Sequence, residues 1–254
     1  MARNDYMPGF TVLHTNDLHG KLTGAAAEVI GRAKSGCDQC LLVDCGDAIS
    51  SGNIYYRPGG EPILARMSEV GYDAMSMGNR EFHFLERGLK TKTGLARFPI
   101  LSANLRGQSD ELSRTVKPYI VKTLGDTRVA LFGLTVPMIT QKMLASKFSP
   151  YWFEDPLVAA AELVPRLREC ADFVIALTHI GLEKDQLLAA SVPGIDLIVG
   201  GHTHAVLEDL IRVGDTVIVQ AGSWGHFLGE VQVSVPDQPE KHSAMEARLI
   251  SLPR

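Results

Sequence analysis

The segment CLLVDCGDAISSG (Cys40–Gly52) carries the strongest indication of the fold class. Its first six residues are almost all apolar, with no alternation of polar and apolar side chains, and the pair Gly46-Asp47 follows at once. A strand with a continuous apolar sequence is buried on both faces, as in a parallel sheet covered by helices. The segment therefore predicts an α/β protein in which Asp47 lies just past the carboxyl end of a central strand.

The same alternation of short apolar runs and helical patterns extends over the rest of the chain. We expect strands at Phe10–His14, Cys40–Cys45, Ala74–Met77, around Ile100–Ser102, Tyr119–Leu124, Arg128–Leu134, Phe173–Leu177, Ile195–Val199, Thr216–Gln220, Leu228–Val235 and Ala247–Leu252. We expect helices at Ala25–Lys34, Pro62–Val70, Glu81–Lys90, Pro156–Cys170 and Glu183–Ala190. Gly125-Asp126 suits a two-residue hairpin turn, so antiparallel pairing should join the parallel sheet. No linker or internal repeat divides the chain, and we expect a single domain over residues 1–254.

The composition is that of an ordinary globular protein. Of 254 residues, 45% are hydrophobic and 21% are charged, which excludes a disordered chain, a collagen-like repeat and a small disulfide scaffold. The formal net charge of -4 indicates no sequence-independent binding to a nucleic acid duplex. No apolar run approaches the roughly 18 residues of a membrane span, and Met1–Gly9 lacks the apolar region of a secretory signal. We therefore expect a cytoplasmic protein with no membrane partner, unless a signal peptide precedes the given chain.

Cys37 and Cys40 form a C-x-x-C pair, a spacing that occurs in zinc sites and in redox proteins. The pair lies between an expected helix and an expected strand, whereas a redox pair of the thioredoxin type needs a helix N-terminus. A structural zinc site needs four ligands, and the chain has no second C-x-x-C. We interpret both residues as ordinary reduced cysteines.

Polar side chains follow five of the expected strands, at the point where each strand ends. They are Asp17 with His19, Asp47, Asn79, His179, and His202 with His204. In an open α/β sheet, ligands bind at the edge where the carboxyl ends of the strands meet. Two carboxylates, four imidazoles and one amide form a nitrogen and oxygen donor set that suits divalent transition metals. Seven donors are too many for one tetrahedral site, and suit two ions about 3.5–4 Å apart that share a bridging carboxylate.

Six segments of the sequence carry a family resemblance. They are HTNDLHG (His14–Gly20), GDAISSG (Gly46–Gly52), GNREF (Gly78–Phe82), LSANL (Leu101–Leu105), LTHIGLEKD (Leu177–Asp185) and GGHTH (Gly200–His204). In this order they resemble the calcineurin-like metallophosphoesterases, and more narrowly the branch of 5′-nucleotidases and 2′,3′-cyclic phosphodiesterases. The resemblance runs from about residue 10 to residue 235. It implies a four-layer α/β/β/α sandwich of two mixed sheets.

The resemblance also implies a centre of two divalent transition-metal ions, Mn, Fe or Zn. Asp17, His19 and His204 would hold one ion and Asn79, His179 and His202 the other, while Asp47 would bridge the two. The implied reaction is hydrolysis of a phosphomonoester or a cyclic phosphodiester by a water that the ions activate. The expected partner is a small phosphorylated substrate, nucleotide-like or another organic phosphate. Two divalent ions outweigh the charge of two carboxylates, so the site would attract an anion although the chain is acidic.

The third of these segments departs from the usual family pattern GNHEFD. Arg80 occupies the position of the catalytic histidine, and His83 occupies the position of the aspartate that orients it. Arginine stays protonated and cannot act as a general acid, but it can bind a phosphoryl oxygen as a fixed cation. On a helix, His83 would share a face with Arg80 and would supply the missing imidazole. The alternative interpretation pairs Arg80 with a nearby carboxylate and leaves His83 as a solvated helix residue. We count Asn79, Arg80 and His83 as candidate catalytic residues.

Nucleotidases of this branch usually carry a second, C-terminal domain that selects the nucleobase, and we expect none here. Two alternative functions stay open on the sequence. One is a related two-metal hydrolase that acts on a sulfur oxyanion intermediate, because sulfur-oxidation enzymes resembling this family also lack the histidine of the GNH segment. The other is a binding module for metal or phosphate without catalysis.

Overall fold

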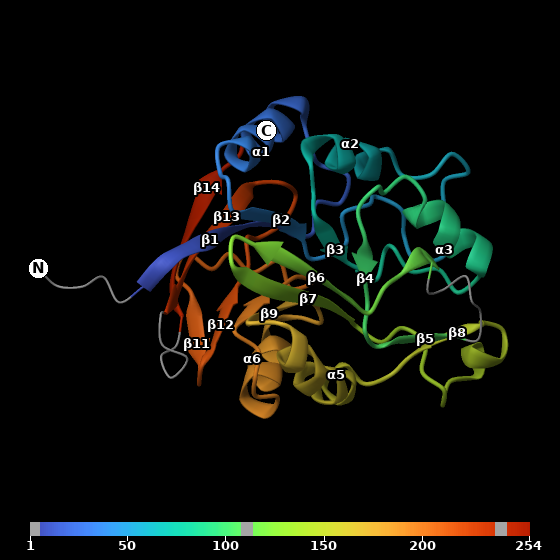
Figure 1. The fold of residues 1–254 in the computed structure, drawn as a ribbon. Coiled ribbons are helices and arrows are strands. Elements are labelled where there is room, and N and C mark those ends of the chain that lie inside the picture. The colour runs from blue at the N-terminus through green and yellow to red at the C-terminus, as the bar shows by residue number, and fades with distance from the viewer. Residues whose placement is uncertain (1–5, 108–113, 237–242) are drawn as a thin grey trace, which may run out of the picture.

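The computed structural model describes residues 6–107, 114–236 and 243–254. It contains two six-stranded mixed sheets, and a small two-stranded sheet of β5 (Leu105–Gly107) and β8 (Tyr151–Phe153). Figure 1 shows the two large sheets stacked between two layers of helices. The four-layer α/β/β/α arrangement expected from the sequence is confirmed.

The first sheet has the order β14-β13-β1-β2-β3-β4. Its strands are β1 (Tyr6–Thr15), β2 (Cys40–Asp44), β3 (Ala74–Ser76), β4 (Ile100–Leu101), β13 (Phe227–Pro236) and β14 (Ala244–Ser251). The strands β1, β2, β3 and β4 are parallel, while β13 and β14 extend the sheet by antiparallel pairing. Every residue of β2 and β3 is buried, as the continuous apolar runs predicted.

The second sheet has the order β11-β12-β10-β9-β7-β6. Its strands are β6 (Tyr119–Leu124), β7 (Thr127–Thr135), β9 (Phe173–His179), β10 (Leu197–Val199), β11 (Ile211–Val213) and β12 (Thr216–Val219). The four inner strands are parallel, and both edge strands pair antiparallel with their neighbours. Gly125 forms the predicted hairpin turn between β6 and β7, with a left-handed φ of 57°.

Three apolar clusters hold the layers together. The inner faces of the two sheets pack on each other through side chains such as Val43, Ile175 and Val199. The helices α1 (Gly24–Ser35) and α2 (Pro62–Val70) cover the first sheet (Figure 1). The helices α5 (Pro156–Cys170) and α6 (Leu182–Ser191) cover the second sheet. The helix α3 (Glu86–Thr93) and the short 3₁₀ helix Leu144–Lys147 lie at the β4 end of the first sheet (Figure 1).

Two of the predicted helices match residue for residue, and each begins with a proline. Pro62 and Pro156 occupy the first turn of α2 and α5, where a missing N–H costs nothing. The side chain of Asp155 caps α5 by accepting from the N–H groups of Leu157 and Val158.

The predicted helix Glu81–Lys90 is wrong in its first half, because α3 begins only at Glu86. The carboxylate of Glu81 accepts from the backbone N–H groups of Asp47, Gly78 and Ile49. These contacts hold the start of the predicted helix in a turn over residues 79–81. The sequence prediction also missed the short strands β5, β8 and β11.

The four cysteines are free thiols, and among the described residues no helix has the length and apolar character needed to cross a membrane.

Asp73 joins three parts of this architecture. Its carboxylate accepts hydrogen bonds from Lys122 on β6, from Lys34 near the end of α1 and from the N–H of Leu42 on β2. Burial alone would raise the pKa of Asp73, but these donors outweigh it and hold the pKa below its ordinary value. The carboxylate therefore ties the edge of the second sheet to the first sheet.

We predict that Asp73→Asn lowers the free energy of unfolding by about 1–2 kcal/mol at pH 7. Because the folded-state pKa is depressed, the contribution is complete above the unfolded-state pKa of about 3.9 and is lost as the pH falls through the folded-state value. Urea unfolding at pH 7 and near pH 3 measures this, and the gap should narrow in acid. The control is Asp172→Asn, which breaks an exposed ion pair with Arg128 and should have little effect. An equal loss in both variants would contradict the role of Asp73.

Candidate metal centre

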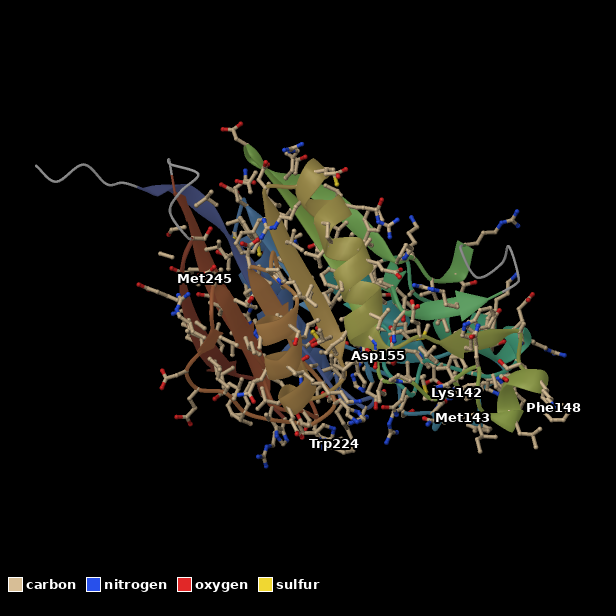
Figure 2. All side chains as sticks on the ribbon, turned by 90° about the horizontal axis from the view of Figure 1, so that it is seen from below. Lys142, Met143, Phe148, Asp155, Trp224 and Met245 are labelled. Atoms are coloured by element: carbon tan, nitrogen blue, oxygen red, sulfur yellow. The ribbon has the colours of Figure 1, made fainter. Side chains whose placement is uncertain are left out.

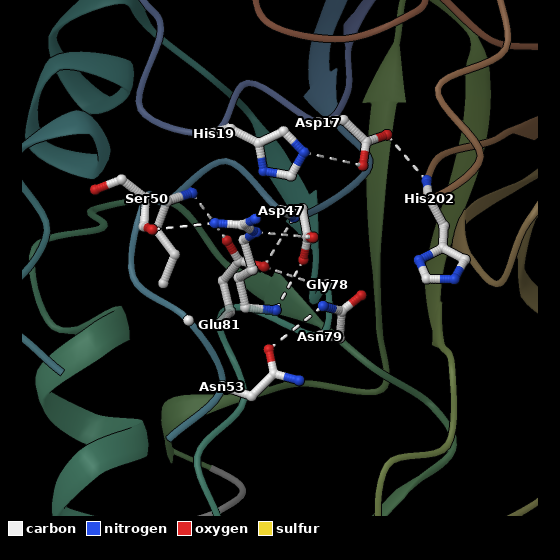
Figure 3. A network of polar contacts seen from close by, with 12 residues as sticks. Asp17, His19, Asp47, Ser50, Asn53, Gly78, Asn79, Glu81 and His202 are labelled. Carbon is white, nitrogen blue, oxygen red and sulfur yellow. Dashed lines mark hydrogen bonds and ion pairs between the residues drawn. The ribbon is translucent and has the colours of Figure 1, made fainter. Parts of the chain in front are cut away.

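The predicted ligand residues lie in loops where both sheets end. Asp17 and His19 follow β1, Asp47 follows β2, Asn79 follows β3, His179 ends β9, and His202 and His204 follow β10. Because the carboxyl ends of parallel strands meet at one edge, the structure brings all seven side chains into one polar cluster. Figure 3 shows Asp17, His19, Asp47, Asn79 and His202 of this cluster.

The first group of donor atoms is formed by Asp17, His19 and His204. The Nε2 atoms of the two imidazoles lie 3.0 Å apart. Oδ1 of Asp17 lies 3.3 Å from Nε2 of His204 and 3.9 Å from Nε2 of His19. Three potential ligand atoms therefore converge on one point between the loops.

The second group is arranged around His179. Its Nε2 atom lies 3.5 Å from Oδ1 of Asp47, 3.2 Å from Oδ1 of Asn79 and 3.3 Å from Nδ1 of His202. On the other side of the ring, Nδ1 lies 2.8 Å from the carbonyl oxygen of Cys45. A carbonyl oxygen can only accept a hydrogen bond, so Nδ1 must be the ring nitrogen that carries the proton. The lone pair of Nε2 then faces the cluster.

The carboxylate of Asp17 lies near the ligand atoms of both groups: it clusters with His19 and His204 on one side and with Asp47 and His179 on the other. Its Oδ2 accepts from Nδ2 of Asn16 and from the N–H of His202, both at 2.9 Å. Its Oδ1 is buried and has no hydrogen-bond partner among the described residues. A buried carboxylate oxygen of this kind requires a partner, and a cation held by the surrounding imidazoles supplies one. The residues present therefore fit divalent metal ions.

The electrostatics of the cluster point the same way. Burial raises the pKa of Asp17 to about 7 and that of Asp47 to about 6, although hydrogen bonds oppose both shifts. Burial lowers the pKa of His19 to about 4 and that of His179 to about 3. The imidazoles are thus neutral at pH 7, which is the form that binds metal. A bound cation would favour the ionised form of both carboxylates.

Left-handed backbone conformations gather at the same place. Six non-glycine residues in the described ranges have a positive φ: Asp17, His19, Asp47, His202, His204 and Trp224. Five of these are predicted ligands. Non-glycine residues adopt this conformation rarely and at a cost, and such residues concentrate at functional sites. The left-handed backbone of these loops costs local stability, and in return it directs the five side chains toward one another.

Glu81 positions the loops of the site, a role that the sequence did not predict. Its Oε2 accepts from the N–H groups of Asp47 at 2.9 Å and Gly78 at 2.8 Å, and Oε1 accepts from Ile49 at 3.2 Å. The loops approach so closely that a Cβ on Gly78 would lie 2.3 Å from the backbone nitrogen of Asp47. Glu81 thereby fixes the loop that carries Asp47 against the loop that carries Asn79.

Arg80 pairs with the carboxylate that the resemblance assigns as the bridge. Its backbone N–H donates to Oδ1 of Asp47 at 2.8 Å, and its Nε lies 3.5 Å from Oδ2. Its Nη1 donates to the carbonyl oxygen of Ser50 at 3.0 Å. This geometry matches the alternative interpretation from the sequence, in which Arg80 pairs with a nearby carboxylate. The guanidinium still adds a positive charge at the mouth of the cluster, where its side chain is 32% exposed.

His83 lies neither on a helix nor in solvent, so both interpretations of its position were wrong. The residue is 2% exposed, and it precedes α3. Its Nδ1 accepts from the N–H of Leu85 at 3.0 Å, and its Nε2 lies 3.1 Å from the carbonyl oxygen of Ile54. Both ring nitrogens are therefore engaged by the main chain. We leave His83 out of the proposed catalytic group.

Two further residues, Asn16 and Trp224, support the candidate ligands. Asn16 supports Asp17 and also accepts from the N–H of Ala221, so it joins the loop after β1 to a distant loop. The ring of Trp224 lies 4.6 Å from that of His19, and the backbone N–H of Trp224 donates to the backbone carbonyl oxygen of Asp17. A signal for Asn16 was its place inside HTNDLHG. Trp224 is one of two tryptophans, and its aromatic side chain fits a pocket wall as well as a core, so only the structure identifies its contact with His19.

The fold and the donor cluster together define a metallophosphoesterase domain, in which two mixed sheets carry metal ligands on the loops at their carboxyl ends. Residues 10–206 match the calcineurin-like phosphoesterase family, and the chain belongs to this family. The resemblance found in the sequence is thereby confirmed.

Individual relatives lie in the nucleotidase branch. The chain is 34% identical to the trifunctional nucleotide phosphoesterase protein YfkN of Bacillus subtilis, over 90% of this chain and 18% of that protein. It is 32% identical to the 5′-nucleotidase of Bos taurus, over 90% of this chain and 47% of the relative. The crystal structure of a 5′-nucleotidase precursor from Thermus thermophilus superposes with a TM-score of 0.78 and 25% identity, over 96% of this chain and 54% of that one. The chain thus spans half or less of the length of these two curated relatives.

We predict that Glu81→Gln loosens the loop that carries Asp47. The amide presents one acceptor where three backbone N–H groups converge, so at least one buried donor loses its partner. The expected loss is at least about 1–3 kcal/mol in the free energy of unfolding, together with weaker binding of Mn²⁺. Urea unfolding and metal titration measure the two effects. The control is Glu86→Gln at the exposed start of α3, and equal behaviour of the two variants would contradict the prediction.

Proposed function

We propose that this domain hydrolyses small phosphate esters with two divalent transition-metal ions. The observation that carries the proposal is the buried oxygen of Asp17, unpartnered among the described residues and set between two groups of converging ligand atoms. Asp17, His19 and His204 would hold one ion, and Asn79, His179 and His202 the other. Asp47 would face both ions. When bound, the ions would activate a water and offset the negative charge of the phosphate.

The residues around these groups divide the remaining tasks. Asn79 turns its Oδ1 toward His179, while its Nδ2 lies 3.4 Å from Oδ1 of Asn53 and can instead donate to a phosphoryl oxygen. Arg80 places a fixed positive charge beside the same position and stabilises the charge that develops on the phosphoryl oxygens. His202 is exposed, so the cluster opens to solvent on this side and a substrate has access to it.

The substrate class follows from the site and is supported by the relatives. A confined positive centre selects an anionic ester over a neutral one. The relatives named above act, by their names, on nucleotides. We therefore propose phosphomonoesters and cyclic phosphodiesters, nucleotide-like or other small organic phosphates, as the substrates. A panel of such esters with Mn²⁺, Fe²⁺, Co²⁺, Ni²⁺ and Zn²⁺ tests the proposal, and absence of turnover with every combination would refute it.

The metal count is the first specific expectation. We predict two ions per chain after loading with Mn²⁺ and dialysis, as measured by elemental analysis. Asp47→Ala should weaken both sites and leave less than one ion. His204→Ala removes a ligand of one group, and about one ion should remain. His226→Ala, at an exposed histidine outside both groups, is the control and should keep two. One ion or none in the unaltered protein would contradict the prediction.

The second specific expectation concerns the leaving group of the ester. Arg80 cannot donate a proton, so an alcohol of high pKa must leave without a general acid at this position. We predict that kcat/KM falls steeply across substituted phenyl phosphates as the pKa of the phenol rises. Arg80→His should flatten this dependence, because positioned general acids contribute about 10²–10⁴-fold.

Arg80→Ala is the matched variant for this experiment. It removes the charge without adding an imidazole, so it should slow all of these esters and keep the slope. A flat dependence in the unaltered protein would mean that another acid already serves the leaving group.

A further inference from the structure

An apolar cavity of about 580 Å³ lies next to the metal centre and has no role in the proposed reaction so far. Its wall is formed by the side chains of Ile54, Phe82, Phe84, Met138, Ile139 and Phe148. Asn53 also lines it, and the Oδ1 of Asn53 lies 3.4 Å from Nδ2 of the candidate ligand Asn79. Asn53 therefore lies between the cavity and the candidate ligand Asn79, beside which a phosphate would bind. Figure 3 shows Asn53 and Asn79 facing each other.

The rim of the cavity exposes large apolar side chains to solvent. Ile54 is 81% exposed and Phe148 is 70% exposed, and the neighbouring Leu144 is also 70% exposed. In Figure 2, Met143 and Phe148 project outward at the end of the molecule away from Met245. Single exposed apolar residues are ordinary, but a group of them around a concave apolar surface indicates a binding site.

The wall of this cavity is held in place by buried polar contacts. His83 contacts the carbonyl oxygen of Ile54 and stacks on the ring of Phe84, with 4.9 Å between ring centres. Lys92 is fully buried, and its Nζ donates to the carbonyl oxygens of Gly52 and Phe82. The loop before the cavity and the aromatic wall behind it are thus tied together. His83 has no place in the proposed catalytic group, but its contacts with Ile54 and Phe84 support the wall of this cavity.

The other flank of the centre has the opposite character. There a cavity of about 310 Å³ is lined by three cations, Lys21, Arg57 and Arg66, and by the acidic Glu61, together with His19 and Ser50. An apolar substituent would be poorly placed among these cations, because their charges would lose water without gaining a partner. Of these two cavities, the one beside Asn53 suits an apolar group.

We infer that the cavity beside Asn53 binds the apolar alcohol portion of the ester while its phosphate lies at the metal centre. The inference rests on the proposed function and narrows its substrate class. The preferred substrates are phosphate monoesters of alkyl or aryl alcohols large enough to reach Phe148. An anchored apolar group would also orient the ester for attack, which raises kcat/KM beyond the gain from contact area.

A series of 4-alkylphenyl phosphates, with straight alkyl chains from methyl to hexyl, tests the inference. The pKa of the leaving phenol hardly changes along this series, so the result is independent of the general acid. We expect kcat/KM to rise about fourfold for each added methylene until the cavity is filled. Phe148→Ala should reduce this increment to less than about twofold. Val158→Ala, at an exposed apolar residue of α5, is the matched control and should leave the increment unchanged. A series without any increment would overturn the inference.

Binding of phosphonates, which resist hydrolysis, separates this inference from the proposed function. Calorimetry on the Mn²⁺-loaded protein should show hexylphosphonate binding more tightly than methylphosphonate, and Phe148→Ala should abolish the difference. If that holds without turnover of any ester, the proposed function fails and the cavity assignment stands. If esters are hydrolysed but the two phosphonates bind equally, the assignment fails and the function stands. Self-association in ultracentrifugation that Phe148→Ala abolishes, together with equal binding, would assign the surface to a second copy instead.

Discussion

The burial of Asp17 between two sets of imidazoles is the constraint on which the rest of the site depends. A carboxylate loses hydration when it is buried, and the described part of the protein returns hydrogen bonds to only one of its oxygens. Desolvation accordingly dominates the raised pKa values of Asp17 and Asp47. Paired or metal-bound carboxylates tolerate such burial, whereas an isolated one does not. Cations bound here would satisfy the buried oxygen of Asp17, and the neutral histidines with the two carboxylates are the groups that would hold them.

Holding these groups together requires backbone geometry that most sequences avoid. The sheets supply the coarse position, because β1, β2, β3, β9 and β10 all end at the same edge. The fine position comes from loops with left-handed residues, which would relax if nothing fixed them. Glu81 and Asn16 provide that fixation by satisfying backbone N–H groups of loops distant in sequence. Strain at the ligands is thus balanced by hydrogen bonds to residues that never touch the substrate.

How far the sequence predicts this arrangement depends on the range of the interactions involved. Local signals located the helices Pro62–Val70 and Pro156–Cys170, because a proline in the first turn defines where each begins. Continuous apolar runs identified the buried strands, and the polar residues at their ends located the ligand cluster. Long-range contacts overrode local preference at Glu81, where a helical pattern yields to hydrogen bonds with Asp47 and Gly78. The buried three-residue strands β3 and β10 still lie in apolar runs, whereas β11 is an edge strand that is only partly buried and leaves no such signal.

Arg80 and His83 depart from the family pattern, and their contacts in the structure explain how the two residues act separately. In the usual pattern these positions form one unit, an imidazole and the carboxylate that orients it. Here the two side chains serve different neighbours: Arg80 contacts Asp47 and Ser50, and His83 supports the main chain at Ile54. The change replaces a proton donor by a fixed charge and, at the same time, anchors the wall of an apolar cavity. An enzyme that gives up a general acid benefits most from substrates whose leaving group needs little protonation, or from tight orientation of the leaving group. Arg80 follows Asn79 in the chain, and Asn79 contacts Asn53 at the edge of the cavity. Under the proposed function, one pair of substitutions would therefore alter both the chemistry and the specificity of the site.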